Sequence, residues 1–401
     1  MRVRLLAFAL ASLTALASAA CGGGKAGPGA KVADQGLPPA NPLAVQRMVE
    51  GVAAMKDGGK DPKAAAKAIA LFREAIGIDP NLWEARFDLG VVLATSGDLA
   101  HAEEALTAAA KIAPEREEVA VALAEVRRRR GENKEAAGAL EEFVKVHPGA
   151  LDARTLLVAS LRDSGQHDKA IAQAREVLVH KPGDPSALAE LALCHLGKGE
   201  RDVAQLLVKQ SLDVNAKSAV AHRVLGLVHL AGGDDAAAFA AFSKAAQEDP
   251  RDTTSRLNMG AVLLRAGSYA KAAEQYKSAL ASAPDETAAQ IGLAAALRGE
   301  SGGKDAKMLE EARALLEKVL EHDPHNIAAL FNMGVLVADS LKKPAEAKSY
   351  FERFLDDAPR DHPSRPEAER QIAAAKNAAA APPSPAPPAA APPATKQGGK
   401  S

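Results

Sequence analysis

The sequence is poor in aromatic residues and in cysteine. Aromatic residues make up 3% of its 401 residues, and cysteine occurs twice, at Cys21 and Cys194. Two cysteines in so long a chain provide no disulfide framework. The 50 basic and 51 acidic residues nearly balance, which argues against nucleic acid as a partner because such proteins usually carry a basic footprint. No apolar run reaches the length of about eighteen residues that a membrane-spanning helix needs.

No group of residues predicts catalysis or the binding of a metal or cofactor. The last three residues, GKS, resemble the end of a phosphate-binding loop, but Ala394 stands where its first glycine belongs and no strand precedes it. His322 and His325 flank an Asp-Pro pair, which we interpret as a solvated turn. Cys194 lies on the apolar side of an expected helix, where a thiol acts as a small hydrophobe. We therefore expect no catalytic residues, no metal, no cofactor and no small-molecule substrate.

The first twenty residues have the pattern of an export signal. Arg2 and Arg4 form a short basic region, and residues 5–16 form an apolar run too short to span a bilayer. Small residues then lead to Cys21. Residues 1–20 are therefore predicted to be a signal peptide, and residues 21–42, rich in glycine and proline, a flexible tether.

Cys21 resembles the acylated cysteine of a bacterial lipoprotein. It follows the small residues ASAA and precedes three glycines, but Ser18 stands where the lipoprotein box usually has leucine. Two outcomes are therefore open: acylation of Cys21, which anchors the protein through lipid, or ordinary cleavage, which gives a soluble periplasmic protein. By resemblance to the sorting rule of enteric bacteria, Gly22 after the cysteine indicates an outer-membrane lipoprotein that faces the periplasm.

Small residues recur every thirty-four residues through most of the chain. Each period reads as a helical hairpin, with a glycine at the turn, an alanine early in the second helix and, in most periods, a proline after it. The turn glycines are Gly97, Gly131, Gly165, Gly199, Gly233 and Gly267. The early alanines are Ala68, Ala102, Ala136, Ala170, Ala204, Ala238 and Ala272. The small or compact residues opposite them are Gly90, Ala124, Val158, Ala192, Gly226 and Gly260. These positions predict closely packed helices.

Nine such repeats fill most of residues 43–377, and a capping helix follows at about 366–377. The repeats are 44–82, 83–116, 117–150, 151–184, 185–218, 219–252, 253–286, 287–326 and 327–361. The eighth carries about six extra residues near Arg298–Lys304, which we expect in a loop. The ninth has Lys342, Lys343 and Pro344 in place of the turn glycine. Residues 378–401, rich in proline and alanine, are predicted to be a disordered tail.

The spacing resembles the tetratricopeptide repeat family, whose signature has a small residue in the first helix, an alanine early in the second helix and a late proline. Leu89-Gly90, Ala102 and Pro114 match it, as do Met259-Gly260, Ala272 and Pro284. The resemblance covers about residues 44–361 and implies an all-α, right-handed solenoid of about nine helical hairpins with a C-terminal capping helix.

In this family the first helices line a concave groove that holds extended peptides or partner helices. The resemblance therefore implies a groove whose lining combines apolar and amide side chains. Asparagine both donates and accepts hydrogen bonds and so suits a peptide backbone. An alternative is that several of these side chains merely pack against the next repeat. The implied groove residues are Phe87, Val91, Leu257, Asn258, Ile291, Phe331, Asn332 and Val335.

Arg127–Arg130 is the densest run of charge in the chain. Cations at the end of a helix interact favourably with its dipole, which is a sufficient structural reason for the run. Arg128 and Arg162 also share one repeat position. Arg128, Arg129 and Arg162 could thus form a ridge that contacts an acidic partner.

Together these features predict a non-catalytic scaffold of the bacterial cell envelope whose partners are other envelope proteins or peptides. The layout is similar to that of envelope lipoproteins that assemble pili, polysaccharide-export channels or the gliding-motility machine, and no motif separates these. The alternatives are a soluble periplasmic peptide-binding or chaperone-like module and a substrate-recruiting subunit of an envelope enzyme.

Overall fold

The computed structural model describes residues 39–58 and 61–380, and every regular element in this part of the chain is helical. The all-α class predicted from the sequence is therefore confirmed. The predicted signal peptide, Cys21 and most of the predicted tether and tail lie outside the described residues. The chain forms two compact units, of which the first ends at Asp234 and the second begins at Asp235.

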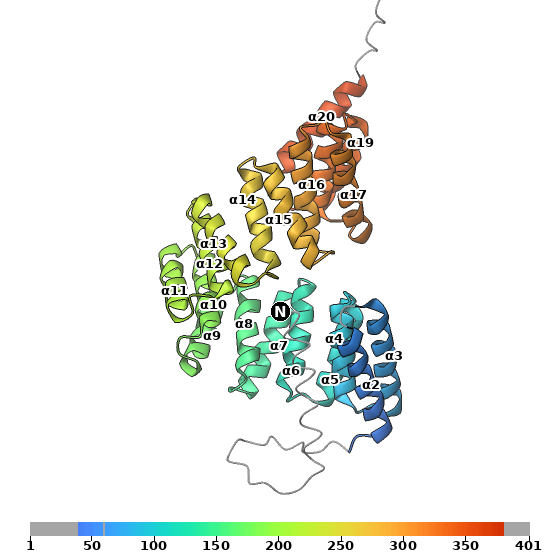
Figure 1. Cartoon of the computed structure of the whole chain (residues 1–401), viewed down its shortest axis with the longest axis vertical. Helices are drawn as coiled ribbons and strands as arrows, with labels where there is room; N and C mark the ends of the chain where they lie inside the picture. Colours follow the sequence, from blue (N-terminus) through green and yellow to red (C-terminus); the bar gives the residue numbers. More distant parts are fainter. Residues whose placement is uncertain (1–38, 59–60, 381–401) are drawn as a thin grey trace, which may run out of the picture. The chain divides into compact units, whose positions relative to one another are not determined.

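In the first unit the helices follow one another side by side in chain order, from α2 in blue to α11 in green (Figure 1). The five predicted repeats between residues 44 and 218 are each one helical hairpin. The helices are α2 (Pro42–Gly58), α3 (Pro62–Ile78), α4 (Trp83–Thr95), α5 (Leu99–Ile112), α6 (Glu117–Arg129), α7 (Asn133–Val146), α8 (Leu151–Asp163), α9 (His167–His180), α10 (Pro185–Gly197), α11 (Arg201–Val214) and α12 (Ala219–Ala231).

The second unit continues the same pattern from α13. It ends with a single helix that is not part of a hairpin. The boundary divides the predicted repeat 219–252, since α12 and α13 belong to different units. The helices are α13 (Asp235–Glu248), α14 (Thr253–Arg265), α15 (Tyr269–Ser282), α16 (Thr287–Ser301), α17 (Ala306–His322), α18 (Ile327–Val335), the π-helix η1 (Leu336–Ser340), α19 (Pro344–Asp357) and α20 (Arg365–Ala380).

The turn glycines have the left-handed backbone that their place in the repeat predicts. All six have positive φ, from 70° at Gly267 to 93° at Gly97. A left-handed backbone costs glycine little because it has no Cβ, and it ends the first helix of each hairpin there. The ninth repeat makes the same kind of turn without glycine: Lys342 takes φ of 57° after the π-helix η1. The missing glycine thus coincides with the one irregular helix in the described part of the chain.

The small residues of the repeat lie at helix contacts, as predicted. All seven early alanines of the second helices are completely buried. A Cβ added at Gly90 would lie 2.6 Å from Cγ of Leu106, and one added at Gly260 would lie 2.6 Å from Cζ of Tyr276. Both distances are far below van der Waals contact. The first helix therefore needs glycine here because a large side chain of the second helix packs against its backbone.

The extra residues of the eighth repeat lengthen its helices and do not form the loop that the sequence predicts. Helix α16 has 15 residues and α17 has 17, against 13 and 14 in α14 and α15. Gly302 and Gly303, both with positive φ, make the turn between them. The residues added before the glycines continue α16, and the acid Asp305 caps the longer α17 through its contacts with the Lys307 and Met308 N–H groups.

The capping helix is confirmed as α20. It packs against α19 and buries Ala368, Ile372 and Ala375. It thereby covers a hydrophobic face that the last hairpin would otherwise expose.

Two glycine-to-alanine substitutions should have opposite effects on stability. Gly260→Ala should lower the free energy of unfolding by about 1–3 kcal/mol, because the new methyl group meets the Tyr276 ring. Gly138→Ala on α7 should raise it by roughly 0.5–1 kcal/mol, because no neighbouring atom lies within 4 Å and alanine favours helix. Urea unfolding followed by circular dichroism measures both, and a stabilised Gly260→Ala variant would contradict the packing described here.

Candidate protein-interaction surfaces

Six of the predicted groove residues lie on three neighbouring first helices of the second unit. Helices α14 and α16 contact each other, as do α16 and α18. All six side chains are half-buried, so each is in reach of solvent on one side. We call this set the first-helix face of the second unit; its residues are Leu257, Asn258, Ile291, Phe331, Asn332 and Val335.

The apolar members of this face rest on the hydrophobic core of the unit. Leu257, Ile291, Phe331 and Val335 all pack against it. The Phe331 ring lies 5.3 Å from the Phe354 ring and 5.9 Å from that of Phe351, between centroids. Packing against the neighbouring elements, the alternative left open by the sequence, is therefore part of their role. Because they are only half-buried, the same side chains also keep apolar surface toward solvent.

The two asparagines of the face differ in their hydrogen bonding within the chain. Asn332 donates from Nδ2 to the carbonyl oxygen of Ala328 at 2.9 Å, one turn earlier in α18. The side-chain amide of Asn258 has no hydrogen-bond partner among the described residues. An amide can donate and accept together, so Asn258 is equipped to bind a peptide group of another chain.

Phe87 and Val91, the predicted groove residues of the first unit, lie in its core. They are 2% and 3% exposed, and the Phe87 ring lies 6.4 Å from that of Trp83. Ten of the thirteen residues of α4 are buried, because α2, α3, α5 and α6 all pack against it. A helix that is buried on nearly every side belongs to the core. These two side chains therefore pack the first unit instead of lining an open surface.

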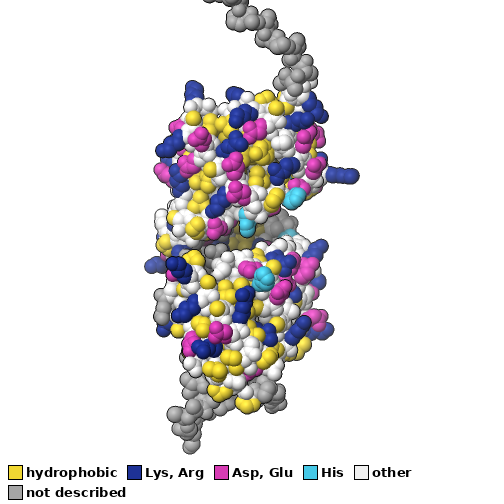
Figure 2. Space-filling view, turned by 90° about the vertical axis from the view of Figure 1, so that its right-hand side faces the viewer, with side chains coloured by type: hydrophobic (Ala, Val, Ile, Leu, Met, Phe, Trp, Pro, Cys, Tyr) yellow, Lys and Arg dark blue, Asp and Glu magenta, His cyan; other side chains and the backbone are white. Residues whose placement is uncertain are grey.

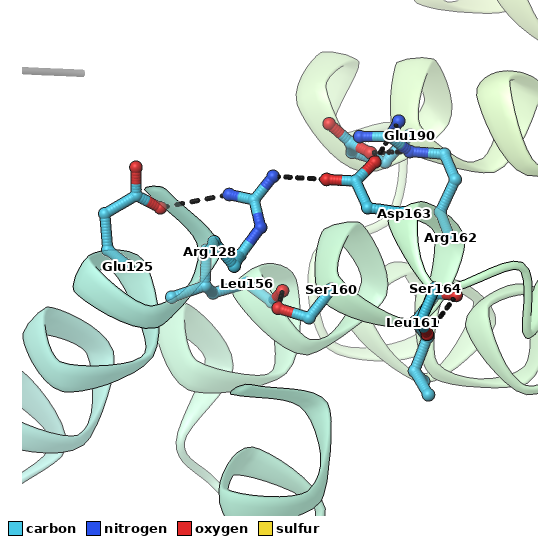
Figure 3. Close-up of polar contacts among 9 residues, drawn as sticks. All are labelled: Glu125, Arg128, Leu156, Ser160, Leu161, Arg162, Asp163, Ser164 and Glu190. Atoms are coloured by element: carbon cyan, nitrogen blue, oxygen red, sulfur yellow. Dashed lines mark hydrogen bonds and ion pairs between the residues drawn. The ribbon is translucent and has the colours of Figure 1, made fainter. Parts of the chain in front are cut away.

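The predicted arginine ridge forms a chain of ion pairs across α6, α8 and α10 (Figure 3). Arg128 of α6 bonds to Glu125 at 3.0 Å and to Asp163 of α8 at 2.6 Å. Arg162 bonds to Asp163 at 2.7 Å and to Glu190 of α10 at 3.1 Å. We call this set the inter-repeat ladder. It gives Arg128 and Arg162 acidic partners within the chain itself.

Arg129 is not part of the inter-repeat ladder and makes its own hydrogen bond within the chain. Its Nη1 donates to the carbonyl oxygen of Ala94 in α4 at 2.6 Å. The three arginines of the ridge thus connect first helices of neighbouring repeats. The sequence leaves an acidic partner open at this ridge, but the charges that such a partner would meet are already matched by internal acceptors.

Electrostatics at Arg128 favour the internal pairs. Its side chain is 16% exposed. Burial alone would lower the pKa of Arg128, but the carboxylates of Asp163 and Glu125 outweigh burial and raise it above its ordinary value. The sequence contains a signal for these pairs: Glu125 lies three residues before Arg128 on one helix face, and Asp163 directly follows Arg162.

Breaking the ladder should destabilise the first unit. Arg128→Met keeps the apolar stem but leaves Asp163 and Glu125 without this cation, so the free energy of unfolding should fall by about 1–3 kcal/mol. In a double-mutant cycle with Asp163→Asn, urea unfolding should give a coupling energy of about 1 kcal/mol. Arg175→Met, at an exposed position of α9, is the control and should change little. A coupling energy near zero would show that the pair adds no stability.

Asp88 of α4 is a buried acid that the sequence analysis did not single out. It is 5% exposed, and its Oδ1 atom has no hydrogen-bond partner. Burial, and next the Glu84 carboxylate, raise the pKa of Asp88 to about 7. Apolar residues flank it, Phe87 before and Leu89 after, and this is the signal that could have found it.

Cys194 is buried in α10, as the sequence predicts. Burial raises the pKa of its thiol to about 12, and a protonated, enclosed thiol is a poor nucleophile. His195 next to it pairs with Glu200, with 2.5 Å between Nδ1 and Oε2. Within residues 39–58 and 61–380, no group of three or more His, Cys, Asp or Glu side chains is placed to hold a metal ion.

On the side shown in Figure 2, basic and acidic side chains are interspersed on each unit and separated by hydrophobic ones. Such a mixture gives no field of a single sign over that face. Of the helices in the described part of the chain, none is both long and apolar enough to cross a bilayer.

The sequence matches two family models, both of the tetratricopeptide repeat. One matches residues 61–126, and the other matches residues 121–187, 189–253 and 257–302. Together they cover more than half of the chain, and the structure shows the hairpins that they describe. The chain therefore belongs to the tetratricopeptide repeat family. No curated protein matches the sequence.

Several solved structures are similar to this chain. A chain of the APC/C hetero-tetramer Cut9–Hcn1 has a TM-score of 0.51 at 14% identity, with 83% of this chain and 66% of that chain covered. Yeast Tom70 has a TM-score of 0.44 at 14% identity, with 84% and 96% covered. The MamA protein has a TM-score of 0.39 at 26% identity, with 44% and 93% covered. The likeness to Cut9–Hcn1 supports the fold alone.

Proposed function

We propose that this protein is a non-catalytic scaffold that binds other proteins or extended peptides on the first-helix face of its second unit. The observation that carries the proposal is the composition of that face: half-buried apolar side chains on three adjacent helices, beside an amide in Asn258 that has no internal partner. Tetratricopeptide repeats are built as extended stacks whose surfaces serve binding, which agrees with this role.

The mechanism is the presentation of a preformed surface. The apolar members of the face are held from below by the core, for instance Phe331 by the rings of Phe351 and Phe354. Little side-chain freedom is then lost on binding, which favours affinity. Leu257, Ile291 and Phe331 would supply apolar contact, and Asn258 would bond to a backbone amide of the partner.

The site of action is proposed from the leader sequence. A signal peptide over residues 1–20 and acylation of Cys21 would make the protein a lipoprotein, with Gly22 directing it to the outer membrane and residues 21–42 as its tether. Its partners would then be other proteins of the bacterial envelope, for example those of a pilus, polysaccharide-export or gliding-motility machine. Ser18 in the lipoprotein box favours a second candidate, a soluble periplasmic peptide-binding module.

Capture of partners from envelope extracts tests the binding face. The variant Asn258→Ala/Ile291→Ala/Asn332→Ala removes the amides and one apolar contact while leaving the aromatic cluster intact. We expect the partners retained by the wild-type protein to fall at least about tenfold, as loss of a few central contacts typically does. Quantitative mass spectrometry of the eluates gives the measurement.

The matched control lies on the second helix of the seventh repeat. Lys271→Ala/Glu274→Ala/Lys277→Ala changes three exposed side chains of α15 and should leave capture as in the wild type. Circular dichroism should show full helical content in both variants. Equal retention of the same partners by the wild type and the face variant would remove the proposed binding site.

The N-terminus of the mature protein decides between the anchored and the soluble form. Mass spectrometry of protein purified from its own envelope should show an N-terminal peptide that begins at acylated Cys21. An unmodified peptide that begins at Ala20 or Cys21 would show the soluble periplasmic form instead.

A further inference from the structure

Tyr276 of α15 carries a hydroxyl group that makes no hydrogen bond within the described part of the chain. The residue as a whole is 4% exposed. Its hydroxyl oxygen is nevertheless not among the unpartnered polar atoms that are shut off from solvent. Burial raises the pKa of Tyr276 to about 12. The hydroxyl is therefore in reach of solvent, protonated and able to donate a hydrogen bond.

The Tyr276 ring reaches the first helices through a gap between two glycines. A Cβ added at Gly260 of α14 would lie 2.6 Å from Cζ, the carbon that bears the hydroxyl, and one added at Gly292 of α16 would overlap both Cζ and Cε1. Because α15 packs against both α14 and α16, the far end of the ring lies between these two first helices. The hydroxyl beyond Cζ thus points toward the first-helix face of the second unit.

The surface is open where the ring emerges. Gly292 is half-buried, and Ala288, one turn earlier on α16, is exposed. Gly292 has no side chain that could cover the hydroxyl, and the methyl group of Ala288 is short. A partner that lies over α16 can therefore reach the Tyr276 oxygen.

The repeat register shows what the hydroxyl replaces. Gly292 is the sixth residue of its repeat, and the sixth residues of the repeats before and after it are Asn258 and Asn332. The face therefore presents a side-chain amide on α14 and on α18, but no side chain on α16 between them. The Tyr276 hydroxyl lies beside the vacant position. It completes a row of three polar groups across the three helices.

This polar row runs beside an apolar one. The polar row consists of Asn258, the Tyr276 hydroxyl and Asn332, and the apolar row consists of the residues just before the sixth positions, Leu257, Ile291 and Phe331. Neighbouring first helices contact each other, and the axes of packed helices lie about 8–10 Å apart. A polyproline II segment has three residues per turn and rises about 9 Å per turn. One turn of such a segment therefore spans two neighbouring helices of the face.

An extended segment matches both rows, whereas a helix matches only the apolar one. The backbone groups of a polyproline II segment are not bonded to one another, so they can bond to the polar row. Every third side chain points the same way and can lie on the apolar row. The backbone groups of an α-helix are already bonded internally. A bound helix would leave the Asn258 amide and the Tyr276 hydroxyl covered and without backbone partners, which is costly.

We propose that the Tyr276 hydroxyl binds the backbone of an extended partner segment that places an apolar side chain at every third residue. This inference rests on the proposed function and defines the partner that the first-helix face accepts. The segment crosses α14, α16 and α18 in a polyproline II-like conformation, and Tyr276 donates to one of its carbonyl oxygens. Proline suits the positions between the apolar residues, because it lacks the N–H but keeps the carbonyl group.

Selection from random twelve-residue peptides displayed on phage tests the register on the full chain. Peptides that also bind the Asn258→Ala/Ile291→Ala/Asn332→Ala variant are removed, so that those kept depend on the first-helix face. We expect apolar residues at positions i, i+3 and i+6. Enrichment of the helical pattern i, i+3, i+4 and i+7 would overturn this inference but leave the proposed function standing. If no peptide distinguishes the wild type from the variant, the proposed function fails as well.

The affinity of the enriched peptide tests the hydroxyl itself. Fluorescence polarisation should show that Tyr276→Phe binds the labelled peptide about 3–10-fold more weakly than the wild type, the change expected for one neutral hydrogen bond. Its urea midpoint should not fall, because the hydroxyl has no partner inside the chain. Tyr350→Phe, which removes the hydroxyl of a half-buried tyrosine on α19, is the control and should bind as the wild type. Equal affinity of Tyr276→Phe and the wild type would overturn the proposal.

NMR of the wild type gives a second measurement. The chain has three tyrosines, so labelling the Cζ carbon of tyrosine with ¹³C gives three signals, which the two phenylalanine variants assign. The Tyr276 signal should shift when the peptide is added, because the new hydrogen bond acts on the carbon that bears the hydroxyl. The Tyr350 signal should stay in place. A Tyr276 signal that does not move in the complex would contradict the proposed contact.

Discussion

Phe351→Ala is expected to lower the free energy of unfolding of the protein by about 3–5 kcal/mol. Phe351 is completely buried in α19. Its ring packs so closely on α18 that a Cβ added at Gly334 would lie 2.6 Å from Cε1. Truncation would leave a cavity between two helices that cannot easily move together, since Phe354 and Met333 on either side are also fully buried. Urea unfolding followed by circular dichroism measures the loss.

Leu355→Ala provides the comparison within the same helix. Leu355 is half-buried and packs at the edge of the same core, so its truncation should cost clearly less, about 1–2 kcal/mol. If partners bind on the first-helix face of the second unit, Phe351→Ala should also weaken partner capture, because Phe331 of that face loses one of its two ring contacts. If the two variants are equally stable, the α18–α19 contact is not the tightly packed centre described here.

Asp88→Asn should change how stability depends on pH. Burial raises the pKa of Asp88 from 3.8 to about 7. Between these pH values the folded protein holds a proton that the unfolded chain has lost, so this group's contribution to stability is present at low pH and is lost as pH rises toward 7. The loss amounts to roughly 3–4 kcal/mol. The asparagine variant cannot ionise. As pH rises from 4 to 7.5, its free energy of unfolding relative to that of the wild type should therefore rise by that amount.

Urea unfolding at pH 4 and pH 7.5, followed by the fluorescence of the single tryptophan, Trp83 in α4, measures the effect. Other acids act in the opposite direction; the pKa of Asp98, for instance, is lowered chiefly by its hydrogen bond with His101. Their contribution is the same in both proteins and cancels in the difference. Asp152→Asn should behave as the wild type. A wild type and an Asp88→Asn variant with parallel pH profiles would show that the carboxyl is not buried as described.

The fold could be predicted because its determinants are local and periodic. Gly97 and its five equivalents are needed for a left-handed turn, and Gly260 is needed where Tyr276 packs against the backbone. Such requirements fix residue types at fixed spacings, and a period of thirty-four residues is readable without a structure. The extra residues of the eighth repeat were misplaced because helix propensity let them extend α16 and α17, whereas only Gly302 and Gly303 mark the turn.

The surfaces were less predictable because exposure depends on neighbours from other helices. Phe87 and Phe331 hold the same position in their repeats, yet Phe87 is enclosed by the helices around α4, whereas Phe331 is half-buried. Arg128 belongs to a run of positive charge in the sequence and Arg162 shares its repeat position, but Asp163 and Glu190 neutralise them across repeats. The buried acid Asp88 could not be predicted from the repeat because a single acid has no periodic signature.

Site-specific cross-linking tests the central claim, that partners bind on the first-helix face of the second unit, most directly. A photoreactive phenylalanine derivative is introduced at Ala261 of α14, which is exposed and lies one turn after Leu257 and Asn258, or at Glu274 of α15, which is exposed on the second helix of the same repeat. Illumination in cells of the native organism should give partner adducts from position 261 and none from position 274. Adducts from position 274 alone would contradict the account.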